Sequence, residues 1–347
     1  ALYEQGLTIA VPTTRELLVT AKKSLRDGLR AVDKRMGYRG PLKKISKSAD
    51  VAEFLEQERI QLISRRLGYQ MFLPDGRLDW IESMTDAGFS SETALLEPDE
   101  LYSAYVYEVD DANKIARVKI GKIDAELPLE HMRWARSIRD EKILNQVRME
   151  PRLPSQVVAK GEVIQIRLVK SIGGKTIVAL DQAPEVQGAI FSVEAQTGYV
   201  LAMEGGYDFS DSEFNRASQA QRQQGSCFKP ILYAAALETG FTRASIIVDS
   251  PIVYADETFG KWKPTNFEEK FYGDTTFRQA LIKSRNVPTI KIAEAIQVPF
   301  TIEYARRLGM TGSFASDLSI SLGSGTSSLV ELTATYSLFP RLGRRLQ

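Results

Sequence analysis

Two residues of the sequence, Ser226 and Lys229, have the types and the spacing of a nucleophile and its base. Pro230 fits the first turn of a helix, so a helix is predicted to begin at this segment. Ser226 then lies at the helix N-terminus, and Lys229, three residues later, returns to the same face. A lysine within hydrogen-bond reach and with a lowered pKa can accept the serine proton. An ordinary helix start would explain the same two residues.

A hydroxyl and a carboxamide, Ser284 and Asn286, form a second candidate pair. They follow a helical pattern over 277–283 and precede Pro288. Both side chains can point into one cleft, where the hydroxyl could relay a proton and the amide could hold a peptide group. The alternative is a helix C-cap at Asn286. The start of the helix offers three capping side chains, Asp274, Thr275 and Thr276.

The scarcity of two residue types limits the other chemistries. Cys227 is the one cysteine and His131 the one histidine of the chain, which excludes internal disulfides, Cys-x-x-Cys metal sites and multi-histidine zinc sites. The scarcity favours lysine over histidine as the base of a serine enzyme, and the family resemblance described below implies that no metal or cofactor is needed. We expect Cys227 to pack within the helix, and His131 to be a residue of the barrel predicted below.

The N-terminal part of the chain, residues 1–97, is predicted to be a helical linker region. Apolar residues recur at helical spacing over 14–36, and Gly37 ends that pattern. A second, shorter helical pattern runs over 54–67.

Residues 98–184 are predicted to form a small OB-type β-barrel. Apolar residues alternate over 101–108, 114–120, 163–169 and 175–180, and a fifth short strand is expected near 125–128. Because no basic, aromatic groove stands out, a contact with another protein or a spacer role is favoured over nucleic-acid binding.

Residues 185–347 begin with a predicted hairpin, 189–193 and 199–203, and then become helical almost to the end. Two strands followed by many helices indicate an α+β domain whose sheet is incomplete.

The composition is that of an ordinary globular chain. Of 347 residues, 43% are apolar and 26% are charged, and 45 basic against 44 acidic side chains give a formal charge of +1. This balance gives no support to nucleic-acid binding. No apolar run long enough to span a membrane and no signal-peptide pattern are present, so an anchored or secreted parent protein would carry its targeting segment upstream.

Local motifs make a family resemblance specific. Ser-x-x-Lys followed by Ser-x-Asn is part of the signature of penicillin-binding proteins, and the surrounding segments are similar to class A members, most of all to the penicillin-binding protein 1A group. The similar segments are PEVQGA (184–189), EGGYDF (204–209), FNRASQAQR (214–222), GSCFKP (225–230), WKPTN (262–266), YG (272–273), FRQAL (277–281), MRWAR (132–136) and GYRGP (37–41).

The resemblance implies a D,D-transpeptidase of cell-wall synthesis with a penicillin-binding, serine β-lactamase-like domain. Ser226 would attack the terminal D-Ala-D-Ala bond of a stem peptide, Lys229 would take its proton, Ser284 would pass a proton to the departing D-Ala, and Asn286 would bind the substrate amide. Stem peptides and β-lactams would be its partners, and the bacterial envelope, at the periplasmic face of the inner membrane, its location. An envelope protein could dock on the barrel.

The sequence departs from the family pattern after Asn286, because no Lys-Thr-Gly motif follows. The glycosyltransferase domain and membrane anchor of the family are also missing upstream. We therefore expect a fragment with little or no crosslinking activity of its own. Two alternatives remain, a serine D,D-carboxypeptidase or β-lactamase-type hydrolase, and a non-catalytic envelope interaction module; acylation of Ser226 by penicillin would separate enzyme from module.

Overall fold

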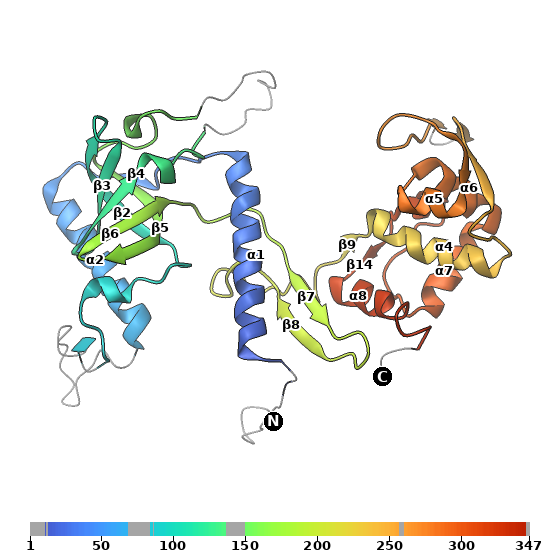
Figure 1. Ribbon diagram of the computed structural model, residues 1–347, viewed down its shortest axis with the longest axis horizontal. Helices are drawn as coiled ribbons and strands as arrows, with labels where there is room; N and C mark the ends of the chain where they lie inside the picture. Colours follow the sequence, from blue (N-terminus) through green and yellow to red (C-terminus); the bar gives the residue numbers. More distant parts are fainter. Residues whose placement is uncertain are drawn as a thin grey trace. The chain divides into compact units, whose positions relative to one another are not determined.

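The computed structural model describes residues 11, 13–68, 84–85, 87–136, 150–256 and 260–344 (Figure 1). The chain forms two compact units: Arg26–Gln187, and Ala1–Leu25 together with Gly188–Gln347. Helix α1 (Arg15–Met36), at the position predicted for the first helix, runs across the point where the units divide. The units divide the chain differently from the predicted domains 1–97, 98–184 and 185–347, whose boundaries stay a prediction.

The unit Arg26–Gln187 is built on one curved sheet with the strand order β1-β5-β2-β3-β4-β6. Pairing between β5 and β6 closes five of the strands into a barrel, so the predicted OB-type fold is confirmed. Strand β1 extends the sheet beyond β5. The strands are β1 (Lys43–Lys44), β2 (Tyr102–Asp110), β3 (Ile115–Ile120), β4 (Ile123–Pro128), β5 (Glu162–Ile172) and β6 (Lys175–Leu180).

The barrel forms because its strands alternate between buried and accessible positions. Ala104 and Val106 of β2 and Val118 of β3 are fully buried, while the residues between them are partly exposed. Helix α2 (Ser48–Leu67) adds Ile63 and Leu67 to the same core. Part of the region predicted as a linker therefore belongs to the barrel core.

A buried carboxylate connects the end of α1 to the segment that leaves the barrel. Asp33 is 2% exposed and accepts hydrogen bonds from Arg39 Nη1 (2.9 Å), Gln182 Nε2 (2.7 Å) and the backbone N–H of Glu185 (3.0 Å). The buried carboxylate thus has hydrogen-bond partners from three other residues, of which Gln182 is buried as well.

The unit that contains Gly188–Gln347 begins with the predicted hairpin, β7 (Ile190–Val193) and β8 (Val200–Glu204), and continues as mostly helical chain. Three further two-stranded pairs occur, β10 with β13, β11 with β12 and β9 with β14, so the α+β prediction is confirmed. Its other elements are β9 (Arg222–Gln223), η6 (Gly225–Phe228), α4 (Lys229–Glu238), β10 (Ile246–Asp249), β11 (Tyr254–Asp256), β12 (Gly260–Trp262), β13 (Gly273–Thr276), α5 (Phe277–Ile282), α6 (Asn286–Ile296), α7 (Val298–Arg307), η7 (Leu318–Leu322), β14 (Thr326–Ser327) and α8 (Leu329–Ser337).

Helix α4 lies in the centre of this unit. Its residues Ile231, Leu232 and Ala235 are fully buried, and they pack against Ile292 and Ala293 of α6. A helix that is apolar on nearly all sides is stable only when other elements surround it. The residue at its start, Lys229, is therefore held in a rigid environment.

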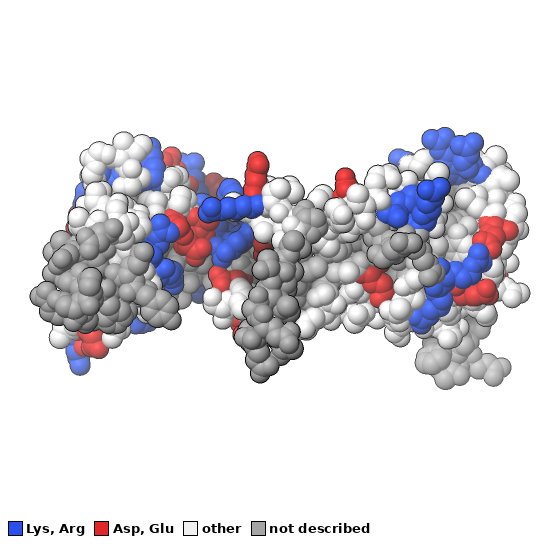
Figure 2. Space-filling model, turned by 90° about the horizontal axis from the view of Figure 1, so that it is seen from below, with Lys and Arg blue, Asp and Glu red and all other residues white. Residues whose placement is uncertain are grey.

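The surface shown in Figure 2 carries basic and acidic side chains in small mixed groups, as the near-zero formal charge leads one to expect. Within the described ranges, no helix combines the length and the apolar character needed to cross a membrane.

Candidate active site

Ser226 lies in the 3-10 turn η6, directly before α4, and its side chain is exposed. The segment around Gly323 supports this turn, because Gly225 N donates to Gly323 O (2.9 Å). Gly323 has a left-handed φ of +74°, and a Cβ at this position would lie 1.9 Å from Gly225 O. Only glycine therefore allows the two backbones to approach this closely. The predicted placement of Ser226 at a helix start is confirmed.

Lys229, the first residue of α4, is 1% exposed. Its Nζ donates to Ser284 O (2.6 Å), Ser284 Oγ (3.2 Å) and Asn286 Oδ1 (2.8 Å). Burial lowers the pKa of Lys229 from 10.5 to about 8, because an ammonium group loses its hydration in the interior. The structure thus brings the lysine together with both residues of the second predicted motif.

The four predicted residues meet at one cavity of about 580 Å³. Ser226, Ser284 and Asn286 line it, while Lys229 lies beside it, below the surface. In the described part of the chain, no hydrogen bond joins Ser226 Oγ to Lys229 Nζ, whose three hydrogens are all directed at other acceptors. Lys229 must lose one of these hydrogens before it can act as a base.

The loop between α5 and α6 presents Ser284 and Asn286. Helix α5 ends at Ile282, and Asn286 is the first residue of α6, so the alternative of a C-cap at Asn286 is wrong. Among the three capping candidates of α5, Thr276 is the cap. Asn286 Nδ2 donates to Thr265 O (3.0 Å), and a carbonyl can only accept, so Asn286 Oδ1 must face Lys229.

The remaining wall of the cavity carries both signs of charge together with two aromatic side chains, Phe267 and Tyr272. The Arg285 guanidinium lies 3.4 Å from the centre of the Tyr272 ring and donates to Asp249 Oδ2 (2.9 Å). Lys283 and Glu268 also line the cavity. Such a wall suits a ligand with many hydrogen-bonding groups, such as a peptide.

Sequence reasoning missed Asp249 and Asn266, two buried residues that contact this loop, of which Asn266 also lines the cavity. Asn266 accepts hydrogen bonds from the N–H groups of Asn286 (2.9 Å) and Val287 (3.2 Å). Asn266 is the last residue of the family-like WKPTN segment (262–266), but that resemblance implies no chemical role for it. Asp249, at the end of a short strand, carries no signal in the sequence.

Neither Cys227 nor His131 lines the cavity at Ser226. Cys227 is exposed, so the expectation that it packs within the helix is wrong; its carbonyl accepts from Tyr336 Oη (2.6 Å). His131 lies in the barrel unit, as expected, in the short turn η3 (Leu129–His131). Across the described ranges, no three His, Cys, Asp or Glu side chains are grouped as metal ligands would be.

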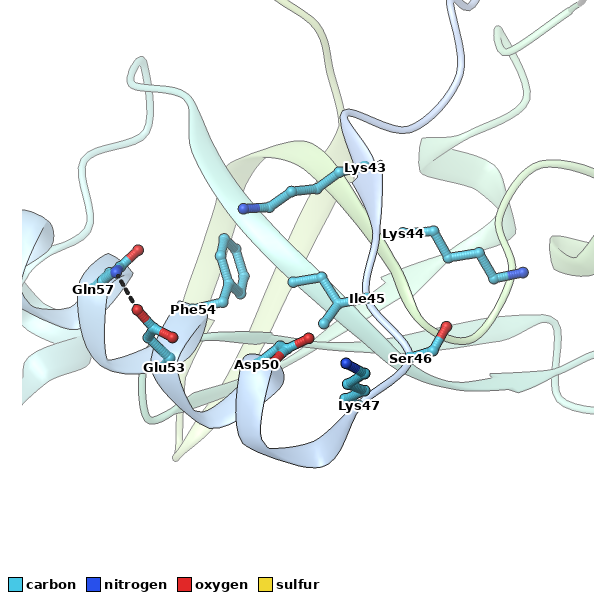
Figure 3. A pocket seen from close by; sticks show the side chains of 9 residues that line it. All are labelled: Lys43, Lys44, Ile45, Ser46, Lys47, Asp50, Glu53, Phe54 and Gln57. Carbon is cyan, nitrogen blue, oxygen red and sulfur yellow. Dashed lines mark hydrogen bonds between the residues drawn. The ribbon is translucent and has the colours of Figure 1, made fainter.

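A second polar cavity, of about 430 Å³, lies in the barrel unit at β1 and the start of α2 (Figure 3). Lys43, Lys44 and Lys47 surround it together with Asp50 and Glu53. Its lysines and acids are exposed rather than buried, so nothing there activates a nucleophile. The cavity at Ser226 is the stronger candidate for catalysis.

Comparisons with known proteins agree with the division of the chain between Gln187 and Gly188. Residues 188–337 match the family model of the penicillin binding protein transpeptidase domain, and residues 38–186 match that of the penicillin-binding protein OB-like domain. The second match begins well before residue 98, in accord with the contribution of α2 to the barrel core.

Several curated relatives are named penicillin-binding protein 1A. The chain is 30% identical to the protein of Pseudomonas aeruginosa and 33% identical to that of Rickettsia conorii, in both cases over 99% of this chain and 37% of the relative. It is 31% identical to the Escherichia coli protein over 98% of this chain and 36% of the relative. The chain thus spans little more than a third of the length of these relatives.

A solved structure shows the same fold. The crystal structure of penicillin-binding protein 1A from Haemophilus influenzae matches with a TM-score of 0.68 and 24% identity, over 94% of this chain and 41% of the other.

Proposed function

We propose, from the premise that the chain belongs to the penicillin-binding protein family, that Ser226 is the nucleophile of a D,D-transpeptidase that crosslinks peptidoglycan stem peptides. One observation carries the proposal: a buried lysine contacts both residues of the Ser-x-Asn motif beside the cavity that Ser226 lines. A buried cation that touches only uncharged acceptors is costly for stability, so its retention is better explained by chemistry than by packing.

The first half of the reaction forms an ester. Ser226 Oγ attacks the carbonyl carbon of the D-Ala-D-Ala peptide bond while neutral Lys229 accepts the serine proton. The C–N bond then breaks, and the terminal D-Ala leaves as an amine after it receives a proton through Ser284 Oγ, which is 3.2 Å from Lys229 Nζ. The products are the acyl ester on Ser226 and free D-Ala.

The second half of the reaction regenerates the serine. An amine of a neighbouring stem peptide attacks the ester carbon, gives its proton to Lys229, and forms the crosslink as Ser226 Oγ leaves and takes a proton back. Asn286 holds the substrate amide through the side-chain hydrogen-bonding capacity that Lys229 and Thr265 leave free. A β-lactam carbonyl would be trapped at the same serine.

The proposal extends to the whole protein. Relatives named penicillin-binding protein 1A are much longer than this chain, and we infer that the reaction belongs to a bifunctional cell-wall synthase at the periplasmic face of the bacterial inner membrane. An envelope protein that docks on the barrel remains a prediction.

Intact-mass measurement after penicillin treatment tests the proposal. The complete protein that carries this chain should gain the mass of one penicillin, and the Ser226→Ala variant should gain none. Cys227→Ala is the matched control, because it removes the neighbouring thiol nucleophile and should still form the adduct.

Product analysis with a stem-peptide substrate then separates the enzyme classes. A crosslinked dimer with release of D-Ala supports the transpeptidase, whereas release of D-Ala without a dimer would indicate a carboxypeptidase. Absence of any adduct in the complete protein would overturn the enzyme proposal and leave an interaction module.

A further inference from the structure

The loop that presents Ser284 and Asn286 is supported by two buried residues, Asp249 and Asn266. Asp249 is the last residue of β10 and is 1% exposed, and Asn266 is 5% exposed. Asn266 Nδ2 donates to both carboxylate oxygens of Asp249, at 3.0 Å each, and to Lys270 O (2.8 Å). All three partners accept, so the orientation of the Asn266 amide is fixed by chemistry.

Asn266 caps helix α6 from a distant part of the sequence. The first N–H groups of a helix have no partner within it, and the side chain of Arg285, in the N-cap position, makes no capping hydrogen bond. Asn266 Oδ1 supplies the missing acceptor to the N–H groups of Asn286 (2.9 Å) and Val287 (3.2 Å). The position of the backbone of Asn286 therefore depends on Asn266.

Ser284 and Arg285, the two residues before Asn286, need support from outside the loop as well. Ser284 has a left-handed φ of +51°, which is unfavourable for a residue with a Cβ and persists only when its surroundings impose it. Arg285 is held by Asp249 Oδ2 at 2.9 Å. One buried pair thus restrains the chain on the C-terminal side of Ser284.

We propose that Asp249 and Asn266 form a positioning pair that holds Ser284 and Asn286 against Lys229 Nζ. Neither residue is assigned contact with the reacting atoms; the pair acts through the hydrogen bonds that fix the start of α6. The inference rests on the proposed acylation of Ser226 and adds to it the residues on which the geometry of the lysine site depends.

The isosteric variant Asn266→Asp tests the pair in the complete protein. It keeps an oxygen to cap α6, but it places a second carboxylate against Asp249 where a donor stood. The loop should shift, and a displacement of about 1 Å at a reacting group can cost on the order of 10²-fold in rate. We expect a loss of this size in the first-order acylation step with benzylpenicillin, with little change in the initial binding constant.

The reciprocal double variant, Asn266→Asp with Asp249→Asn, restores one donor facing one acceptor, leaves a side-chain oxygen at position 249 to accept from Arg285, and returns the net charge to its original value. It should recover most of the lost acylation rate. The double variant still lacks the hydrogen bond to Lys270 O, so its stability should not be fully restored. Recovery of the acylation rate without full recovery of stability would therefore indicate positioning.

Asn215→Asp is a matched control, because it makes the same amide-to-carboxylate change at a residue that does not line the cavity. Like Asn266, Asn215 accepts a backbone hydrogen bond through Oδ1, from Ala217 N (3.0 Å). It should acylate at the unaltered rate. Thermal unfolding is measured for every variant, and if Asn266→Asp does not fold, Asn266→Ser gives the same comparison without the added charge.

The outcomes separate the two proposals. An unaltered acylation rate in folded Asn266→Asp or Asn266→Ser, or a folded double variant no faster than the single one, would overturn the positioning pair while the serine chemistry stands. Absence of acylation in the unaltered protein would overturn both.

Discussion

The pH dependence of acylation follows directly from the burial of Lys229. Lys229 must be neutral to accept the Ser226 proton, and burial lowers its pKa from 10.5 to about 8. At pH 7 the neutral fraction is then about 9%, against about 0.03% for an unshifted lysine, a gain of about 300-fold. The burial of Lys229 would thus provide a large part of the reactivity that the proposed mechanism requires.

The first-order acylation rate of the complete protein should therefore rise about tenfold per pH unit below pH 7 and level off above about pH 8. Stopped-flow measurement with a fluorescent penicillin between pH 5.5 and 10 would record this profile. Ser226→Ala gives the background from hydrolysis of the reagent at each pH. Lys229→Met, which preserves length and burial without a titratable group, should lose both the rate and its pH dependence.

Two results would refute the reasoning. A rate that continues to rise until about pH 10 would show that burial does not lower the pKa of Lys229. A rate independent of pH in the unaltered protein, or unchanged in Lys229→Met, would show that another group accepts the proton.

Three further predictions concern the surroundings of the site. Asn286→Asp places a carboxylate 2.8 Å from Lys229 Nζ, which should raise the lysine pKa by about 1–3 units, slow acylation at pH 7 and move its plateau to higher pH. Gly323→Ala should cost about 2–5 kcal/mol of unfolding free energy in urea denaturation and should slow acylation, because the added Cβ clashes with Gly225 O. Gly309→Ala is the control, because Gly309 also has a positive φ (+95°) but no atom lies within 4 Å of the added Cβ. It should cost only about 1–2 kcal/mol and leave acylation unchanged. Asp33→Ala removes the carboxylate that accepts from Arg39, Gln182 and the Glu185 N–H, and should cost about 1–3 kcal/mol in the barrel unit, measured by intrinsic tryptophan fluorescence during urea unfolding; no measurable cost would contradict the role given to that carboxylate.

Local pattern was sufficient to predict most elements, while the chemical roles of Ser226, Lys229, Ser284 and Asn286 stay a prediction. Alternation of period two revealed the barrel strands, because their buried and accessible positions follow the pleat. Pro230 marked the start of the helix that carries Lys229, because proline is favoured in a first turn. Each of these features depends on residues close together in the chain.

Interactions between distant segments could not be predicted in the same way. The interpretation of Asn286 as a C-cap failed because its backbone N–H is capped by Asn266, twenty residues earlier, which lets a new helix begin. The contribution of α2 to the barrel core was missed because a weakly amphipathic pattern does not indicate what the helix packs against. Cys227 was expected to pack within the helix, from the family resemblance and its residue type, but its position in the turn before α4 leaves it exposed.

The proposed role of Lys229 as a base depends on groups that other segments of the chain supply. A buried lysine next to a carboxylate would have a raised pKa and would stay charged at neutral pH. Here the hydrogen-bonding partners of Nζ are a carbonyl, a hydroxyl and a carboxamide, which hold the ammonium in place without a countercharge. The nearest carboxylate of this network, Asp249, reaches the site only through Asn266 and Arg285. Asp249 can therefore fix the loop while its charge is compensated by Arg285, so the lysine remains able to lose its proton.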